Sequence, residues 1–256
     1  MKRLVGWTIL AALAAGGCGG QSMDQWFKDK LVPEPTVAKV PRIESAKPDE
    51  RREALQAVAA DPGARQSANV IKLYCLVATT DKDPMVRSAA VRGLGDMQGE
   101  GILAALGLVL EKDESPYVRM DAAASLGRRG NPEGIPDLAK AVAKDPQSDV
   151  RAAAAEALRY FKDKAAGQVL VKALGDPSLA VEQKAWESLR YMTGQNIPRM
   201  AQPWEDFFVA SEHPFEAYGK PPPMPEGQNQ RPKFRKGPLE FIQGLFAKDV
   251  REQELE

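Results

Sequence analysis

The sequence predicts an all-α protein: a right-handed α-solenoid of about four to five helix pairs, with extended proline-rich flanks. Two observations predict this fold. The first is the distribution of proline, because residues 50–193 hold seven of the 20 prolines and the two flanks hold the other 13. Proline breaks helix interiors, so a proline-poor middle favours helices. The second is an internal repeat of about 32 residues that runs through the same middle.

Six columns of matching residues define the repeat. Each unit contains a valine five positions after an aspartate. An alanine follows this valine by four positions and a leucine follows it by eight. In three units an arginine comes directly after the valine. A second leucine lies twenty positions after the valine in those three units. The columns are Asp81, Asp113, Asp145 and Asp176; Val86, Val118, Val150 and Val181; Arg87, Arg119 and Arg151; Ala90, Ala122, Ala154 and Ala185; Leu94, Leu126, Leu158 and Leu189; and Leu106, Leu138 and Leu170. Valine, alanine and leucine at this spacing share one helix face, so each unit is predicted to be a helix pair.

These columns resemble the HEAT repeat, in the short bacterial form that phycobilisome-lyase-like proteins also contain. The resemblance covers about residues 50–193. It implies that the aspartate and arginine columns form a ladder between neighbouring units. The last unit has Glu182 in place of arginine, which suits a terminal unit. The first unit, residues 50–80, is degenerate, since Leu55 stands where the arginine would be.

The aspartate and arginine columns allow two interpretations. A row of arginines could bind anionic ligands. We favour structural ion pairing between repeats, because every arginine in the row has an aspartate in its own unit that can neutralise it.

Residues 1–17 are predicted to be an export signal peptide. Lys2 and Arg3 precede an apolar stretch of twelve residues, which is too short to cross a bilayer comfortably, and small residues then lead to Cys18. This resembles the lipobox of bacterial lipoproteins, in which the cysteine is diacylated and becomes the mature N-terminus. An ordinary signal peptide is the alternative. The lipobox implies a protein of the bacterial cell envelope, lipid-anchored to a membrane on its periplasm-facing side or in the outer membrane.

The segments on either side of the repeats are expected to differ from them. Residues 18–49 are predicted to be a proline-containing tether. Residues 194–256 are predicted to contain an aromatic cap over the open end of the solenoid, a proline-rich linker and a C-terminal amphipathic helix. That helix, residues 238–250, could dock in a groove of a partner or fold back onto the solenoid, and the sequence does not choose between them.

The composition argues against several functional classes. Lysine and arginine together number 35, as do aspartate and glutamate, which argues against a polybasic nucleic-acid binder. His213 is the single histidine, so a multi-histidine metal site is excluded. Two cysteines cannot build a disulfide framework, and Cys75 lies in a predicted buried helix. We therefore expect no metal, no cofactor and no enzymatic activity.

The expected function is that of a membrane-anchored scaffold that binds a protein or peptide partner. Solenoids expose long faces built from successive helices. The possible partner-binding residues on that face are Arg92, Arg128, Glu156, Arg159, Glu187 and Arg190. Two alternatives stay open: an enzyme resembling the HEAT-type bilin lyases that acts on a tetrapyrrole, and a purely structural spacer.

Overall fold

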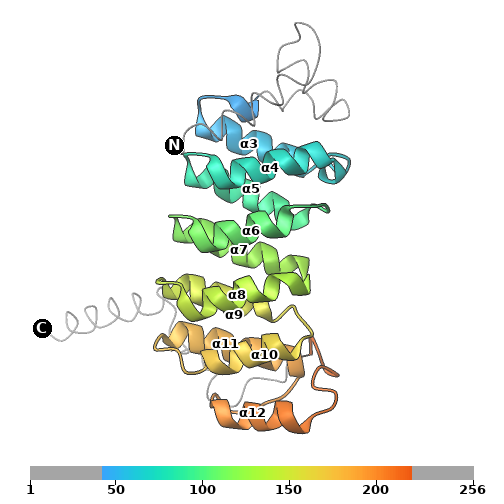
Figure 1. Cartoon of the computed structure of the whole chain (residues 1–256), viewed down its shortest axis with the longest axis vertical. Helices are drawn as coiled ribbons and strands as arrows, with labels where there is room; N and C mark the ends of the chain where they lie inside the picture. Colours follow the sequence, from blue (N-terminus) through green and yellow to red (C-terminus); the bar gives the residue numbers. More distant parts are fainter. Residues whose placement is uncertain (1–41, 221–256) are drawn as a thin grey trace, which may run out of the picture. The chain divides into compact units, whose positions relative to one another are not determined.

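The computed structural model describes residues 42–220, and these residues contain ten α-helices and no strand (Figure 1). The helices are α3 (Pro48–Ala59), α4 (Ala68–Thr80), α5 (Pro84–Asp96), α6 (Ile102–Lys112), α7 (Pro116–Arg129), α8 (Ile135–Lys144), α9 (Ser148–Leu158), α10 (Lys164–Ala173), α11 (Leu179–Thr193) and α12 (Ala201–Ala210). The predicted all-α solenoid of helix pairs is confirmed. The predicted signal peptide, Cys18, most of the tether, the proline-rich linker and the C-terminal helix lie outside the described residues.

The packed helix pairs are those that the aspartate-containing turns join. Helix α4 packs on α5, α6 on α7, α8 on α9 and α10 on α11, with α3 before the first pair and α12 after the last. The turn between α4 and α5, residues 81–83, is shorter than the connection between α5 and α6, residues 97–101. A short turn holds two consecutive helices antiparallel and in contact, so the structural unit begins one helix earlier than a unit counted from the aspartate.

The pairs stack so that the helices form two layers (Figure 1). Helices α3, α5, α7, α9 and α11 contact one another in that order, and we call them the odd layer. Helices α4, α6, α8, α10 and α12 do the same, and we call them the even layer. A single pair cannot bury its apolar face alone, so stacking of neighbours creates one continuous core between the layers.

The apolar columns of the repeat form this core. The four column valines and the four column alanines are all 0% exposed, and the leucines of both columns are at most 1% exposed. Alanine is small, so its column lets neighbouring helices of the odd layer approach closely. Buried hydroxyl groups add contacts between the same helices, because Ser125 Oγ donates to the carbonyl of Val91 at 3.1 Å and Ser188 Oγ to that of Ala155 at 3.0 Å.

A glycine marks a close crossing of two helices in the odd layer. Gly127 lies within α7, and a Cβ built on it would come within 2.9 Å of Ala157 Cα on α9. The repeat predicts both Gly127 and Gly130 at helix exits, and α7 ends at Gly130, which has a left-handed φ of 61°. Gly127 is therefore required by packing between helices and Gly130 by backbone conformation.

The aspartates of the repeat organise the turns before the odd-layer helices. Ser115 and Ser178 occupy the N-cap positions of α7 and α11, but their side chains form no capping hydrogen bond. Asp113 Oδ1 accepts a hydrogen bond from the Ser115 backbone N–H at 2.8 Å, and Asp176 Oδ1 accepts one from that of Ser178 at 2.8 Å. Each carboxylate thus bonds the N–H of the N-cap residue itself, which orders the turn but does not cap the first N–H groups of the helix.

Residues 194–220 close the C-terminal end of the array. Trp204 of α12 is 0% exposed, and its indole N–H donates to the carbonyl of Pro198 at 2.9 Å. The indole N–H of Trp186 on α11 donates to the carbonyl of Ile197 at 2.8 Å. The ring of Phe208 packs directly on Gly167 of α10. These contacts cover the apolar side of the last helix pair with aromatic residues.

Gly127→Ala tests the close crossing of α7 and α9. A methyl group would overlap Ala157, so we expect a loss of about 1–3 kcal/mol in the free energy of unfolding, even though alanine is the better helix former. Urea unfolding followed by circular dichroism measures it. Gly175→Ala is the matched control, because a Cβ there has its nearest neighbour at an ordinary 3.5 Å. A Gly127→Ala protein as stable as the wild type would contradict the packing account.

Candidate functional site

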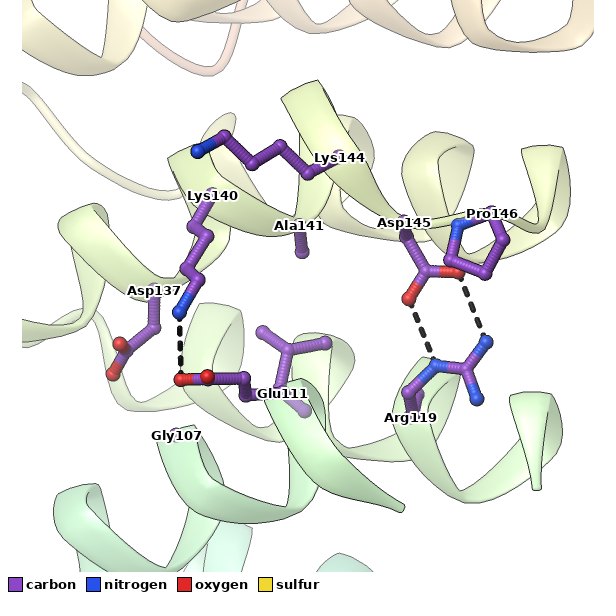
Figure 2. Close-up of a pocket in the computed structure, with 10 residues that line it drawn as sticks. Gly107, Glu111, Arg119, Asp137, Lys140, Ala141, Lys144, Asp145 and Pro146 are labelled. Carbon is purple, nitrogen blue, oxygen red and sulfur yellow. Dashed lines mark hydrogen bonds and ion pairs between the residues drawn. The ribbon is translucent and has the colours of Figure 1, made fainter. Parts of the chain in front are cut away.

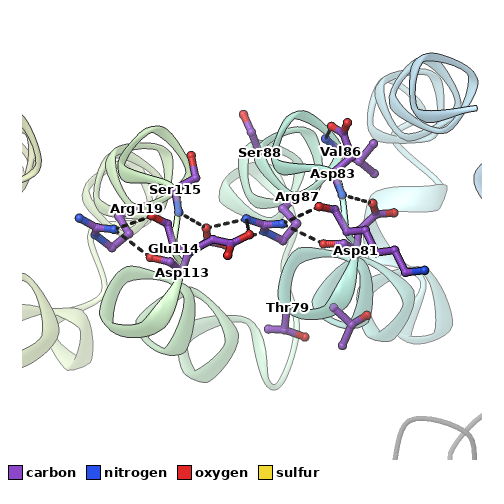
Figure 3. Close-up of polar contacts among 12 residues, drawn as sticks. Thr79, Asp81, Asp83, Val86, Arg87, Ser88, Asp113, Glu114, Ser115 and Arg119 are labelled. Carbon is purple, nitrogen blue, oxygen red and sulfur yellow. Dashed lines mark hydrogen bonds and ion pairs between the residues drawn. The ribbon is translucent and has the colours of Figure 1, made fainter. Parts of the chain in front are cut away.

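An arginine–aspartate ladder links successive helix pairs at the turn edge of the array. Arg87 Nε and Nη2 donate to the two carboxylate oxygens of Asp113 at 2.7 and 2.8 Å (Figure 3). Arg119 binds Asp145 in the same way at 2.8 and 2.9 Å (Figure 2), and Arg151 and Asp176 repeat this geometry. Each carboxylate partner belongs to the next unit, as expected of a ladder between neighbouring units, and is not the aspartate of the arginine's own unit that was expected to neutralise it.

The aspartate of the arginine's own unit contributes its backbone. Nη1 of Arg87 donates to the carbonyl of Asp81 at 2.9 Å, and Nη1 of Arg119 to that of Asp113 at 2.8 Å. Each guanidinium thus binds one turn through a carbonyl and the next turn through a carboxylate. The ladder runs through the turns of all the packed helix pairs and fixes their relative positions.

The ladder is largely buried and its charges are satisfied. The Arg119 and Asp145 side chains are 9% and 6% exposed. The hydrogen bond from Arg151 lowers the pKa of the Asp176 carboxyl, and the backbone N–H of Ser178 lowers it further. Arginine and carboxylate that bind each other through two hydrogen bonds leave little capacity for an external ligand. The geometry supports structural ion pairing over anion binding for this row.

Arg51 is a ladder residue that sequence reasoning missed. Its Nε and Nη2 donate to the carboxylate of Asp81 at 2.9 and 2.8 Å. The separation of this pair is 30 residues, whereas Arg87 and Asp113 are 26 apart. The loop between α3 and α4, residues 60–67, is longer than its equivalents and shifts the register. The fixed 32-residue step therefore points to Leu55, one helical turn beyond the arginine that acts.

The ladder ends with a reversal of charge. Glu182 replaces the arginine on α11, and Arg199 Nη1 lies 3.7 Å from its Oε1. The same nitrogen donates to Gln183 Oε1 at 2.9 Å. The cation at this end thus comes from the segment that follows α11 instead of from the repeat.

The expected partner-binding residues of α5 and α7 are exposed and paired. Arg92 is 44% exposed, and its Nη1 lies 2.9 Å from Asp121 Oδ2 on the neighbouring helix. Arg128 is 42% exposed and lies 3.8 Å from Asp96. These pairs sit on the outward side of α5 and α7, so both guanidinium groups are accessible from solvent.

The row of paired charges continues on α9 and α11. Glu156 lies 3.2 Å from both Arg159 and Lys184. Lys184 is also 3.7 Å from Glu187. These side chains are 28–39% exposed. The structure therefore brings five of the six expected partner-binding residues into one row across α5, α7, α9 and α11.

Arg190 differs from the other five. The residue is 3% exposed, and its guanidinium carbon lies 4.6 Å from the centre of the Trp186 ring. Burial lowers the pKa of its guanidinium. The segment after α11 covers this side of the helix, because Trp186 is bonded to Ile197. Arg190 is therefore not available to a partner in this conformation.

Tyrosines beside Arg159 extend the exposed row. The guanidinium carbon of Arg159 lies 4.9 Å from the ring centre of Tyr160 and 5.1 Å from that of Tyr191. Tyr191 in turn packs edge-on against Tyr218 at 5.3 Å. Sequence reasoning missed this cluster, although a signal was present: Leu-Arg-Tyr occurs at residues 158–160 and again at 189–191.

A cleft of about 260 Å³ lies between α6 and α8 of the even layer (Figure 2). Glu111, Asp137, Lys140 and Lys144 are among the residues that line it. Lys140 Nζ lies 2.8 Å from Glu111 Oε2, and Lys112 and Lys140 together lower the pKa of the Glu111 carboxyl to about 2. The cleft combines both signs of charge and contains neither histidine nor cysteine.

The remaining candidate residues are the two cysteines and the single histidine. Cys18 lies outside the described residues. Cys75 is a half-buried free thiol whose pKa is raised by burial, and His213 lies on an exposed loop. Within residues 42–220, no three histidine, cysteine or carboxylate side chains gather as a metal site would require. In the same range, the helices are too short or too polar to cross a bilayer.

Comparison with known proteins identifies the repeats. The sequence matches the protein family described as HEAT repeats over residues 71–159 and again over residues 103–190. The two matches together span residues 71–190, which agrees with the expected resemblance to HEAT repeats. No curated protein matches the chain.

Several solved structures share the HEAT-like fold. Human deoxyhypusine hydroxylase in complex with glycerol is 18% identical, with 67% of this chain and 84% of that chain covered and a TM-score of 0.43. An engineered protein is 23% identical, with 66% and 86% covered and a TM-score of 0.44. The complex of CpcE and CpcF of phycocyanin lyase from Nostoc sp. is 18% identical, with 69% and 79% covered and a TM-score of 0.39. Likeness at this level concerns the fold alone.

These structures correct one expectation. The prediction of no enzymatic activity is wrong, because a hydroxylase and a lyase are among the proteins with a HEAT-like fold. The prediction relied on the absence of familiar catalytic motifs in a repeat protein. A fold of this type hosts enzymes as well as other proteins, so it does not exclude catalysis.

Asp176→Asn tests the ladder. The variant leaves the Arg151 guanidinium without its carboxylate, so we expect a loss of about 3 kcal/mol in the free energy of unfolding at pH 7. The folded-state pKa of Asp176 is lowered, so its stabilising effect is present above the unfolded value near 3.9 and is lost as the pH falls through the folded value. Urea unfolding from pH 7 to pH 2.5 should therefore show the difference between wild type and variant shrinking in acid.

The matched control is Glu114→Gln. Glu114 lies 3.6 Å from Arg87 but is 85% exposed, so its removal should change stability by less than about 0.5 kcal/mol. Equal losses in the two variants, or a difference for Asp176→Asn that does not depend on pH, would contradict the assignment of a buried ladder.

Proposed function

We propose that this chain is a membrane-anchored HEAT-repeat scaffold that binds a protein or peptide partner in the bacterial cell envelope. The observation that carries the proposal is the row of part-exposed, paired charges on α5, α7, α9 and α11. We call it the odd-layer row; its members are Arg92, Arg128, Glu156, Arg159 and Glu187, with Asp96, Asp121 and Lys184 as their ion-pair partners.

The ion pairs of the odd-layer row are weak enough for the charged groups of a partner to replace them. Exposed ion pairs contribute about 0.2–1 kcal/mol each, whereas breaking a buried pair costs about 3–5 kcal/mol. A partner that offers its own carboxylates and cations can therefore replace the contacts of the odd-layer row at low cost. A partner cannot replace the contacts of the buried ladder at low cost. The pairing also holds each side chain in a defined position before binding, which lowers the entropy cost of association.

The tyrosine cluster adds an aromatic surface beside the paired charges. Tyrosine and arginine are over-represented among residues that dominate binding energies, and Arg159 stacks between Tyr160 and Tyr191. Tyr160 is 38% exposed, so the aromatic surface is accessible. An apolar surface beside a row of paired charges suits a protein segment better than a small ion.

Membrane attachment belongs to the proposal through Cys18. The residue follows an apolar stretch and a run of small residues, as the lipobox does. Two or three acyl chains would hold the protein firmly, because each buried methylene contributes about 0.8 kcal/mol. Residues 18–49 would then connect the anchor to the repeats.

Charge reversal in the odd-layer row tests partner binding. Full-length protein crosslinked in native cells should retain an envelope protein that the Arg92→Glu, Arg128→Glu variant loses by at least tenfold, because each reversal places like charges in the interface. Quantitative mass spectrometry of the crosslinked material measures this. The control variant Lys72→Glu, Lys82→Glu carries the same change in net charge away from the row and should retain the partner. No specific neighbour, or equal loss in both variants, would contradict the proposal.

Cys18→Ser tests the anchor. The variant lacks the thiol that lipid modification requires, so the protein should move from the membrane fraction to the soluble fraction after cell lysis and ultracentrifugation. Metabolic labelling with a fatty-acid analogue should mark the wild type and not the variant. A Cys18→Ser protein that stays with the membranes at high salt would overturn the lipoprotein assignment.

A further inference from the structure

The two layers of the array differ in how their exposed charges are compensated. In the odd-layer row, four cations face four anions, and each is within 4 Å of an opposite charge. The cations are Arg92, Arg128, Arg159 and Lys184, and the anions are Asp96, Asp121, Glu156 and Glu187. This surface is neutral and internally paired.

The even layer carries an excess of lysine. Helices α4, α6, α8 and α10 contain six lysines, no arginine and two acidic residues. The lysines are Lys72, Lys112, Lys140, Lys144, Lys164 and Lys172, and the acidic residues are Glu111 and Asp137. All six lysines are exposed. The two layers therefore have different electrostatic character even though they are built from one repeat.

The two carboxylates do not compensate this excess. Glu111 is shared, since its Oε1 lies 2.8 Å from Lys112 Nζ and its Oε2 lies 2.8 Å from Lys140 Nζ. The carboxylate of Asp137 lies against the backbone of Gly107, because a Cβ built on Gly107 would overlap Asp137 Oδ2. Lys144 and Lys172 form no hydrogen bond or ion pair with the residues that the structure describes.

The excess is concentrated on three neighbouring helices. We call this surface the lysine face; it consists of Lys112 on α6, Lys140 and Lys144 on α8, and Lys172 on α10. Lys164 is engaged elsewhere, because its ammonium group donates to the carbonyl of Ser211 at 3.2 Å. The face ends at α12, which carries Glu205 and Asp206.

The chemistry of the face favours a lipid surface as its partner. Lysine presents a hydrated, flexible point charge, which suits diffuse attraction to many phosphates, whereas arginine suits two-bond recognition of a single group. A membrane that contains anionic lipids attracts each nearby lysine, and the attraction falls off within a Debye length of about 10 Å at 0.1 M salt. A tether that holds the domain near the bilayer keeps its lysines close enough to be attracted by the anionic lipids.

We propose that the lysine face lies against the anionic headgroups of a phospholipid bilayer and that this contact orients the odd-layer row away from the membrane. The inference takes from the proposed function only the attachment to a membrane. It assigns the two layers separate partners: lipid for the even layer and protein for the odd layer.

Vesicle binding by the full-length Cys18→Ser chain tests the proposal without the contribution of lipid modification. Sedimentation with vesicles of phosphatidylcholine alone, and of phosphatidylcholine with 30% phosphatidylglycerol, separates apolar from electrostatic binding. The apolar N-terminal stretch contributes to both vesicle types and to every variant. We expect stronger binding to the anionic vesicles at 0.05 M salt, and loss of that preference at 0.5 M salt.

Lys140→Gln, Lys144→Gln, Lys172→Gln should abolish the preference. Each lysine near an anionic surface accounts for about a fivefold change in partitioning, so the triple variant should lose about a hundredfold. The control Arg92→Gln, Arg128→Gln, Lys184→Gln removes the same number of positive charges from the odd layer and should keep the preference. Circular dichroism should show equal helix content in all three proteins, since every substituted side chain is exposed or part-exposed.

Three results would overturn the proposal: equal binding of the starting protein to both vesicle types, retention of the preference by the lysine variant, or equal loss in the control. These outcomes are independent of whether a protein partner is captured. Failure of the partner-binding experiment with success here would leave a HEAT array oriented on a membrane without a known partner.

Discussion

The two-bond contact between an arginine and the aspartate of the next unit is the interaction on which the array depends. Each carboxylate serves two purposes, because it accepts hydrogen bonds from the guanidinium of the preceding pair and from the backbone N–H two residues later, at the end of its own turn. Neither partner is replaceable alone, since its loss leaves a buried charge unpaired. The contact therefore couples the conformation of each turn to the position of its neighbour, and the apolar columns meet in register as a result.

The ladder also determines which charges are available for other purposes. Arg119 is 9% exposed, and its guanidinium donates hydrogen bonds to the turns on both sides. Its role is therefore structural. Arg92 is of the same residue type and lies five residues after Arg87 on the same helix, but it is 44% exposed and binds one carboxylate, which is 26% exposed. Burial, not residue type, separates a structural arginine from one that can exchange partners.

The sequence predicts most of what the 32-residue period controls and little of what lies outside it. Val86 and its equivalents are buried because every unit needs the same helix face in the core. Arg51 was not predictable from the period, because a longer loop moves the acting arginine by one turn. Arg190 occupies an outward position by periodicity, yet the segment after α11 covers it. Gly127 serves a contact with Ala157 that depends on the distance between two helices, which no local pattern encodes.

Repetition itself explains why the two layers can diverge. The core columns must repeat, because each unit packs on copies of itself, but an exposed column is free of that constraint. Leu108, Lys140 and Lys172 occupy equivalent positions at a 32-residue step, and the leucine is 52% exposed while the lysines continue the same face. The odd layer pairs its exposed cations with acids, whereas Lys144 on α8 and Lys172 on α10 form no ion pair within residues 42–220. In a solenoid, the exposed columns that do not repeat therefore determine which partners can bind. The two faces of this array differ in whether the charges of those columns are paired.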